Sequence, residues 1–577
     1  MALRQFYTGI RRLKDNHKLF NTYGRKIVQC YSFDSRHVRF KDTFNYKILQ
    51  FFESSTNYKT HVLSGNVQQT LNDELLRKIL DNETELNQLS LSELLDGIVM
   101  ASSRYNYEVD LDLVRKFDDE CFRRLKVGLS LEDTLKVLDA LMRLSNEIPQ
   151  MRAFYLCLQL FNEKLESGEN IDIQNFVQVL FFVSLIRDEQ PVRQFFSIAM
   201  KKLYRHSDLL YKLNPFELAI FCNSVYKTGT KLRNELLLKK LVNCINKNLD
   251  YLFSQPYLFT SVIKPLQHAN YNHYKFLDRL SNLLLDNKLR MDDKDLIASV
   301  YLLKLYANAL YKDEITILFL ADKVLKSLQN SYQNNDTVRI KDISVILKAF
   351  CHFGFDSLKE RVVGQLIPII DVLFETEVHN KRLKYSIEIL LWLNVIGIRP
   401  KGIMENFICR ENLEKGKREG KRKHQSRVNL LLTILSIEHP DILTSKKVQH
   451  LVEDGVTNDV GIKLSHPELD KVQEAVQFLA ACRSDLIRSY QCRYLVPNLF
   501  IKGIVIETRR SMIAVELLGE RACLHGTDIP HGYMNLKLRL LRKMNYEVIL
   551  INKRDIKGIQ EDLMVKIEDE IRRIDNL

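Results

Sequence analysis

The chain has 577 residues, of which 46% are hydrophobic and 27% are charged, and its formal net charge is +13. This length and hydrophobic content predict about two to four domains with sizeable cores, while eleven prolines and twenty glycines exclude long disordered or linker-rich regions. No uninterrupted apolar run approaches the roughly 18 residues of a membrane-spanning helix, and the positive charge suits a polyanionic partner or serves solubility alone.

The ten cysteines are scattered along the chain rather than clustered. None forms a Cys-x-x-Cys motif, and most lie in apolar helical stretches, as Cys157 does between two leucines. Zinc sites and disulfide frameworks need closely spaced or paired cysteines. The cysteines are therefore expected to be small buried hydrophobic residues of a reducing compartment, and no metal ion or other cofactor is expected.

The amino terminus carries a separate signal. Residues 1–40 contain nine Lys or Arg against two acidic residues, and Leu3, Phe6 and Ile10 recur at helical spacing. A basic, acid-poor amphipathic helix without a long apolar stretch is typical of a mitochondrial transit peptide, which places the protein in the mitochondrial matrix. An ordinary surface helix and a basic nucleic-acid-binding arm are the alternatives. Residues 41–84 are assigned to an N-terminal extension.

Residues 85–412 repeat a pattern of paired amphipathic helices. In each repeat an apolar anchor opens a helix with an i, i+3, i+4 stripe, and a second amphipathic helix follows after a short turn. The anchors are Leu94, Leu135, Phe176, Leu218, Phe259, Leu296 and Ile343, at spacings of 41, 41, 42, 41, 37 and 47 residues. This period is typical of one helical hairpin per repeat. The residues predicted to cap the first helices are Ser92, Asp133, Asp172, Asn214, Asp293 and Asp342.

One hairpin cannot bury its apolar face alone, so the hairpins are expected to stack into a solenoid with an extended concave surface. Such surfaces bind peptides or single-stranded nucleic acid. The Leu and Phe stripes are expected to form the core. Ligand contacts in this array are therefore expected on the polar residues between the stripes.

Basic residues are concentrated in residues 413–428, which hold seven Lys or Arg, two Glu and two Gly. This composition predicts an exposed loop or linker. Its Lys421, Arg422 and Lys423 either contact RNA phosphates, with release of counterions, or form a solvated charge run. Residues 429–494 are then predicted to be helical again.

The pattern changes near the carboxyl terminus. Residues 501–507, 511–519 and 545–551 are rich in Ile, Val and Leu and are bounded by turn residues, which predicts strands. Residues 535–544 between the last two runs are predicted to be a helix. Residues 495–577 are therefore expected to form a small α/β module at the end of a mostly α-helical chain.

This module resembles the RAP domain, which is associated with organellar RNA metabolism and is similar to small restriction-type nucleases. The residues that carry the resemblance are Glu516, Gly519, Lys537, Arg539, Leu541 and Tyr546. Together with the helical repeats and the transit-like start, the order of parts resembles the FAST kinase family of mitochondrial RNA-regulating proteins, so residues 85–412 and 429–494 would include FAST-like regions. The resemblance implies action on the processing, stability or translation of organellar transcripts, with RNA-processing or mitoribosomal proteins as further partners.

Catalytic motifs are sparse. The chain contains no Gly-x-Gly-x-x-Gly, His-Arg-Asp or Asp-Phe-Gly sequence, so it lacks the parts that a protein kinase needs. Restriction-type nucleases hold a divalent metal with strand carboxylates beside a lysine, and the candidates here are Glu516, Glu507 and Lys537. However, Leu518 stands where that pattern needs a lysine. The alternative is that the two glutamates pair with basic neighbours at the strand ends, and on this view no residue is catalytic.

A basic surface on the module is the last signal. From Lys502 to Lys557 there are eleven Lys or Arg against six acidic residues. The candidate RNA-binding residues of the module are Lys537, Arg539, Arg542, Lys543, Lys553, Arg554 and Lys557. The leading hypothesis is a non-catalytic mitochondrial protein that binds single-stranded transcripts. A metal-dependent endoribonuclease and a protein-binding helical scaffold are the alternatives.

Overall fold

The computed structural model describes residues 44–61, 79, 85–104, 111–144, 151–167, 172–185, 190–286, 296–333, 338–375, 383–419, 422–452 and 467–576. The predicted transit peptide lies outside these residues, as does much of the predicted N-terminal extension. The chain divides into two compact units, Met1–Leu203 with Lys227–Gly229, and Tyr204–Tyr226 with Thr230–Leu577. Among the described residues, no helix combines the length and apolar character needed to cross a bilayer.

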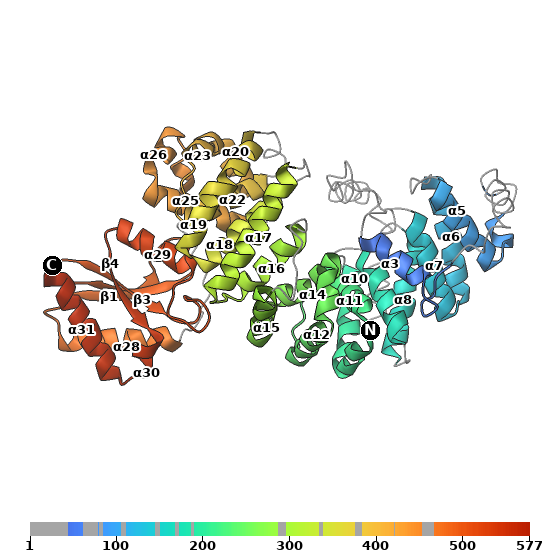
Figure 1. The fold of residues 1–577 in the computed structure, drawn as a ribbon, viewed down its shortest axis with the longest axis horizontal. Coiled ribbons are helices and arrows are strands. Elements are labelled where there is room, and N and C mark those ends of the chain that lie inside the picture. Colours follow the sequence, from blue (N-terminus) through green and yellow to red (C-terminus); the bar gives the residue numbers. More distant parts are fainter. Residues whose placement is uncertain are drawn as a thin grey trace, which may run out of the picture. The chain divides into compact units, whose positions relative to one another are not determined.

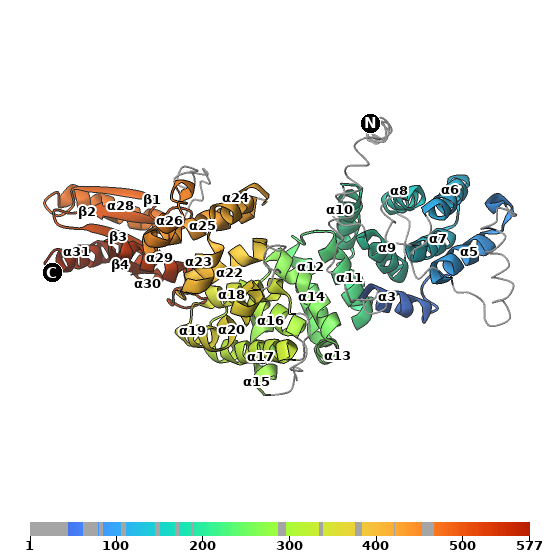
Figure 2. The same cartoon turned by 90° about the horizontal axis from the view of Figure 1, so that it is seen from above.

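The first unit is built from helices in two layers. Its elements are α3 (Phe44–Glu53), η2 (Leu86–Gln88), α5 (Leu91–Arg104), α6 (Leu111–Val127), α7 (Leu131–Leu144), α8 (Arg152–Glu166), α9 (Ile173–Leu185) and α10 (Gln190–Arg205). Helix α7 packs against α5 and α9 in one layer, and α6 packs against α8 in the other (Figure 2). Each layer buries the apolar stripe of its helices against the other.

The second unit continues the helical pairs. Its elements up to residue 452 are η4 (Ser207–Lys212), α11 (Pro215–Lys227), α12 (Glu235–Lys247), α13 (Leu249–Ser254), α14 (Pro256–Ala269), α15 (Tyr274–Leu285), α16 (Leu296–Asn308), α17 (Glu314–Gln333), α18 (Ile340–Phe353), α19 (Asp356–Arg361), η5 (Val362–Leu366), α20 (Ile367–Glu375), α22 (Leu383–Val395), α23 (Lys401–Phe407), α24 (Arg410–Glu419), α25 (Arg422–Glu438) and α26 (Pro440–Ser445). Helices α14, α16, α18, α22 and α25 pack in succession as one layer, and α15, α17 and α19 pack as the next (Figure 1).

The predicted repeat of helical hairpins is confirmed. The seven anchors lie on α5, α7, α9, α11, α14, α16 and α18, and each anchor is buried. A second helix follows each of these, so one repeat is one hairpin. The anchors therefore form the core between the layers, as expected.

The predicted caps are confirmed only in part. Asn214 and Glu217 form a capping box at the start of α11, with each backbone N–H donating to the partner's side chain at 2.9 Å. At α5, by contrast, Ser90 rather than Ser92 accepts from the backbone N–H of Glu93. Asp342 does not cap α18, because both its carboxylate oxygens accept from the Arg339 side chain.

The prediction of a loop over residues 413–428 is wrong, because α24 and α25 cover nearly all of it. Lys, Arg and Glu are strong helix formers. In α24, Glu414 lies 2.7 Å from both Arg410 and Arg418, at the helical i, i+4 spacing. Leu413 is fully buried, so the segment also has an apolar anchor.

The C-terminal module is a three-layer α/β structure. Its elements are α28 (Pro467–Cys482), β1 (Ser489–Tyr494), β2 (Lys502–Glu507), β3 (Met512–Leu518), α29 (Gly532–Lys543), β4 (Glu547–Asn552), α30 (Lys553–Lys557) and α31 (Gln560–Asn576). The sheet order is β1-β2-β3-β4, antiparallel except for the β3–β4 pair, which is parallel because α29 crosses between these strands. Helix α29 covers one face of the sheet, while α28, α30 and α31 cover the other (Figure 1).

The mostly α fold with a small C-terminal α/β module is therefore confirmed, but the module begins before residue 495. Helix α28 contributes Leu469, Val472 and Val476 to the core beneath the sheet. The segment at 489–494 is strand β1, whose polar and apolar residues alternate, rather than the end of a helix. The structure therefore places the start of the module at α28.

Candidate nucleic-acid interface

A buried ion pair lies between the sheet of the module and α29. Glu516 on β3 and Lys537 on α29 are both 0% exposed, and Lys537 Nζ donates to Glu516 Oε2 at 2.5 Å. Nζ also donates to the backbone carbonyl of Lys502 at 3.2 Å. Burial raises the pKa of Glu516 to about 7 and lowers the pKa of Lys537, while the attraction between the two groups acts against both shifts.

Gly503 on β2 provides the space for this pair. A Cβ at this position would lie 3.1 Å from Lys537 Nζ and closer still to Glu516 Oε1. Within the described residues, Oε1 itself has no hydrogen-bond partner. The Glu516 carboxylate and the Lys537 ammonium are both closed off from solvent, so each depends on the other. A buried charge without a partner is strongly destabilising.

The structure does not bring the candidate nuclease residues together. Glu507 pairs with Met512 across β2–β3, four residues from the Glu516 position on β3, which separates the two glutamates by roughly 13 Å along the strand. Glu507 instead accepts a hydrogen bond from Ser489 at 2.9 Å. No group of three or more His, Cys, Asp or Glu residues that could hold a metal occurs in the described part of the chain. The two-carboxylate arrangement that the alternative of a nuclease requires is therefore not formed by Glu516 and Glu507.

Lys537 is also wrongly predicted to contact RNA, because its side chain is fully enclosed. The helical spacing accounts for this. Lys537 shares a face of α29 with Met534 and Leu541, and both of these residues are 0% exposed. The face of α29 that carries Lys537 is thus the face that packs on the sheet.

Arg539 joins the module to the helical array. Its Nε donates to Glu438 Oε1 of α25 at 2.7 Å, and its two terminal nitrogens donate to the backbone carbonyls of Asn394 at 2.6 Å and Val395 at 3.1 Å. Those carbonyls belong to the last turn of α22, where backbone oxygens lack helical partners. Arg539 therefore caps α22 from the module, which corrects its prediction as a direct RNA contact.

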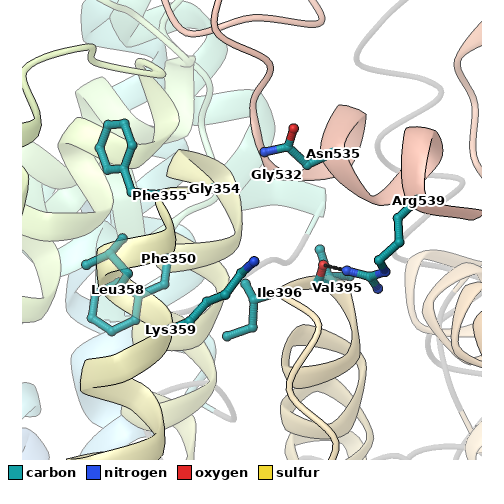
Figure 3. A pocket seen from close by; sticks show the side chains of 10 residues that line it. All are labelled: Phe350, Gly354, Phe355, Leu358, Lys359, Val395, Ile396, Gly532, Asn535 and Arg539. Carbon is teal, nitrogen blue, oxygen red and sulfur yellow. Dashed lines mark hydrogen bonds between the residues drawn. The ribbon is translucent and has the colours of Figure 1, made fainter. Parts of the chain in front are cut away.

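Three glycines allow the module and the array to approach each other closely at the junction. A Cβ on Gly532, the first residue of α29, would overlap the carbonyl oxygen of Cys351 in α18. Gly354, the left-handed cap of α18, lies against the Asn535 side chain, and Gly397 lies under the Arg539 guanidinium. Figure 3 shows Asn535 and Arg539 reaching from α29 toward the ends of α18 and α22.

The groove at this junction is too small for a nucleotide. It is lined by apolar residues such as Phe350, Leu358 and Ile396 and by the cations Lys359 and Arg539 (Figure 3). It leaves about 30 Å³ for the centres of water molecules. A cavity needs roughly 10–15 Å³ per water, so this groove holds a few waters and acts as part of the packing.

Aromatic and imidazole rings fill the centre of the junction. Tyr533 packs edge-on against His352 and Trp392, with ring centroids 5.7 and 6.2 Å apart. His531 caps α29 by accepting from the Tyr533 backbone N–H at Nδ1, which leaves Nε2 to donate to the Arg521 carbonyl at 2.7 Å. Burial lowers the pKa of His352 to about 3. Both histidines are thus neutral packing residues at physiological pH.

The loop between β3 and α29 makes a second attachment that sequence patterns did not indicate. The His525 ring stacks on Tyr274 of α15, with centroids 3.3 Å apart. The His525 backbone N–H donates to the Leu310 carbonyl at 2.8 Å. The module thus contacts the array from α15 to α25.

Cations lie at and next to Glu438, and we define a basic junction of Arg399, Arg539, Arg542 and Lys543, of which Arg539 is half-buried and the other three are exposed. Glu438 is 1% exposed, and Arg399 approaches the carboxylate oxygen that Arg539 binds, at 3.9 Å. Arg542 and Lys543 follow Arg539 by three and four residues and are exposed. In the described part of the chain, neither of these two side chains forms an ion pair or hydrogen bond. The basic junction therefore carries a surplus of positive charge.

The other predicted RNA-binding residues are dispersed. Lys553 pairs with Glu520, and the 89% exposed Arg554 lies 3.7 Å from Asp528. Lys557 is exposed. Lys421 lies outside the described residues, and so do the side chains of Arg422 and Lys423, whose backbones begin α25.

Comparison with known proteins adds no assignment to this geometry: no protein-family model matches the chain, and no curated protein matches it.

Proposed function

We propose that this protein binds RNA at the basic junction and does not cleave it. The observation that supports the proposal most directly is that Arg399 and Arg539 meet at the buried Glu438 carboxylate, while the exposed Arg542 and Lys543 lie one turn beyond Arg539 on α29. Arginine forks and lysine ammonium groups are the usual ligands of RNA phosphates.

The charge balance at the junction favours a polyanion. Glu438 is already held by Arg539, so it offers little to the other cations. The Arg399 side chain is 48% exposed and lies as far as 3.9 Å from that carboxylate. Its interaction with Glu438 is therefore weak. Together with Arg542 and Lys543 this leaves three cations that face solvent and can each neutralise a phosphate.

A binding role fits this site better than a nuclease role. Lys537 pairs with Glu516, the one buried strand carboxylate among the described residues, and the second candidate carboxylate, Glu507, lies roughly 13 Å along the strand. A metal-dependent nuclease needs convergent oxygen ligands. The resemblance to the FAST kinase family and the basic start of the chain extend the proposal to mitochondrial transcripts, whose processing, stability or translation the protein would regulate.

Replacing Arg399, Arg542 and Lys543 together with alanine is expected to weaken RNA binding by the full-length protein and to reduce its salt dependence. The slope of log K against log[salt] should fall by about 2, since each phosphate contact on a single strand contributes about 0.7. Fluorescence anisotropy with a labelled single-stranded RNA over a salt series measures both quantities.

The matched control replaces three exposed lysines of the array with alanine: Lys212 on η4, Lys239 on α12 and Lys275 on α15. It removes the same net charge elsewhere, so a slope close to that of the unmodified protein is expected. Equal losses in both triple variants would mean that overall charge, and not the basic junction, governs binding. Intact RNA after incubation with Mg²⁺ is the expected result for the binding role.

A further inference from the structure

Lysines and tyrosines alternate across α11, α14 and α16, which are first helices of three repeats of the array. We call Tyr226, Lys264, His268, Tyr301 and Lys304 the aromatic–cation cluster. Lys264 Nζ of α14 lies 5.5 Å from the ring centroid of Tyr226 on α11 and 5.0 Å from that of Tyr301 on α16. Lys304 lies 5.5 Å from the Tyr301 ring, and the rings of Tyr226 and His268 are 6.2 Å apart. All five side chains are half-buried.

These residues occupy one face of their helices, between the buried stripes. Lys264 and His268 are separated by four residues and Tyr301 and Lys304 by three, so each pair points to the same side. Their immediate neighbours, such as Ile263 and Leu302, are buried in the core. The cluster thus lies on the side of α11, α14 and α16 that faces away from the core. These three are the first helices of their hairpins.

The line of rings and cations continues toward α22. Arg339, just before α18, is near enough to Tyr301 and to Tyr385 of α22 to interact electrostatically with both. Lys384 lies 5.4 Å from the Tyr385 ring. Asp342, a carboxylate beside this line, is 4% exposed and is held by the Arg339 fork at 2.7 and 2.9 Å. The line therefore brings rings and cationic side chains together.

The geometry points to a track for single-stranded RNA along this line, in which bases stack on Tyr226 and Tyr301 and Lys264 and Lys304 contact phosphates. This inference rests on the proposed RNA binding and names a second, separate surface for it. Proteins that bind single strands combine aromatic stacking platforms with a positively charged path. An acidic peptide would use the lysines but would gain little from the rings, so the alternation favours RNA.

Changing Tyr226 and Tyr301 together to leucine tests the track in the full-length protein. The probes are labelled oligoadenosine and oligouridine RNAs of about 15 nucleotides, and the duplex that they form. Single-strand affinity is expected to fall by at least about 30-fold, because two stacked bases are lost, each contributes about 1–3 kcal/mol, and about 1.4 kcal/mol corresponds to tenfold. The loss should be larger for oligoadenosine, whose bases stack more strongly, and absent for the duplex. The salt slope should not change.

Three further variants serve as controls for this experiment. Tyr211 and Tyr251, which are 48% and 53% exposed, are replaced by leucine as the matched control and should bind normally. Phenylalanine at Tyr226 and Tyr301 keeps the rings and should preserve binding, which separates stacking from folding. Glutamine at Lys264 should lower the salt slope by about 0.7.

The possible outcomes separate this inference from the proposed function. Unchanged single-strand affinity in the Tyr226→Leu/Tyr301→Leu variant, with normal binding by the unmodified protein, would overturn the track and leave the basic junction as the RNA site. Failure of the unmodified protein to bind any of the probes would overturn both. Equal competition by a glutamate-rich peptide that is weakened by Lys264→Gln but not by the tyrosine changes would assign the line to protein binding instead.

Discussion

The Lys537→Met substitution is expected to destabilise the C-terminal module by about 3–5 kcal/mol, because it leaves Glu516 buried without a partner. Glu516 and Lys537 are both fully enclosed, and Oε1 of Glu516 already lacks a hydrogen-bond partner within the described residues. Chemical denaturation of the purified protein, followed by circular dichroism, measures the change. Unfolding of the module ahead of the array would appear as an additional transition.

The pH dependence of this variant provides a second readout. Burial alone raises the pKa of Glu516 above its unfolded value, and the lysine that opposes this shift is gone. Between the unfolded pKa and the raised folded pKa, the folded state binds more protons than the unfolded state. The stability of the variant therefore falls as pH rises through this window, and the variant should be closer to the unmodified protein at about pH 5 than at about pH 8.

The double variant Glu516→Leu/Lys537→Met is the control for the ion pair. Replacement of a buried pair by apolar residues of similar volume is often neutral or stabilising. The double variant is therefore expected to recover most of the stability that the single variant loses. If it proved as unstable as Lys537→Met, packing rather than unpaired charge would be the cause.

Alanine at Gly532 is expected to separate the module from the array. The added Cβ would overlap the carbonyl oxygen of Cys351, which is backbone and cannot move without shifting α18. We expect a loss of about 3 kcal/mol of docking free energy, the upper end of the usual cost of overpacking, because the overlap is with backbone. Hydrogen exchange should then increase in α29 and at the end of α18, while the core of the sheet stays protected.

Gly402→Ala is the matched control for this change. Gly402 lies in α23 with open space around the position of a Cβ, and alanine there is expected to be neutral or slightly stabilising. Equal exchange in the Gly532→Ala variant and the unmodified protein would show that the contact with Cys351 relaxes without undocking. In that case the Arg539 interactions and the attachment of His525 to Tyr274 and Leu310 would hold the two parts together.

The sequence was sufficient for the architecture because periodic signals are local. The seven anchors fell on seven buried helical positions, and the β-branched runs of the module became strands β2 to β4. The strand β1 was missed because its polar residues alternate with half-buried ones and no strong apolar run marks it. Local composition also misled at 413–428, where two glycines and many charges are compatible with a helix once Glu414 forms its ion pairs.

Side-chain roles were harder to predict because they depend on distant partners. The burial of Lys537 could have been predicted, because it lies four residues before Leu541 on the same face of the helix. Its positive charge alone had suggested an exposed position. The role of Arg539 was not available, since its partners lie 101 to 145 residues away in the chain. Only Arg542 and Lys543 of this helix keep the exposed position that an RNA contact requires.

The docking of the module relies on main-chain atoms of the array, and this has a consequence for its tolerance of substitution. The carbonyls of Cys351, Asn394 and Val395 are present whatever side chain those positions carry. Substitutions at these three positions of the array therefore leave the contacting carbonyl groups in place. Sequence constraint falls instead on a few positions of opposite kind, the long fork of Arg539 and the missing side chain of Gly532.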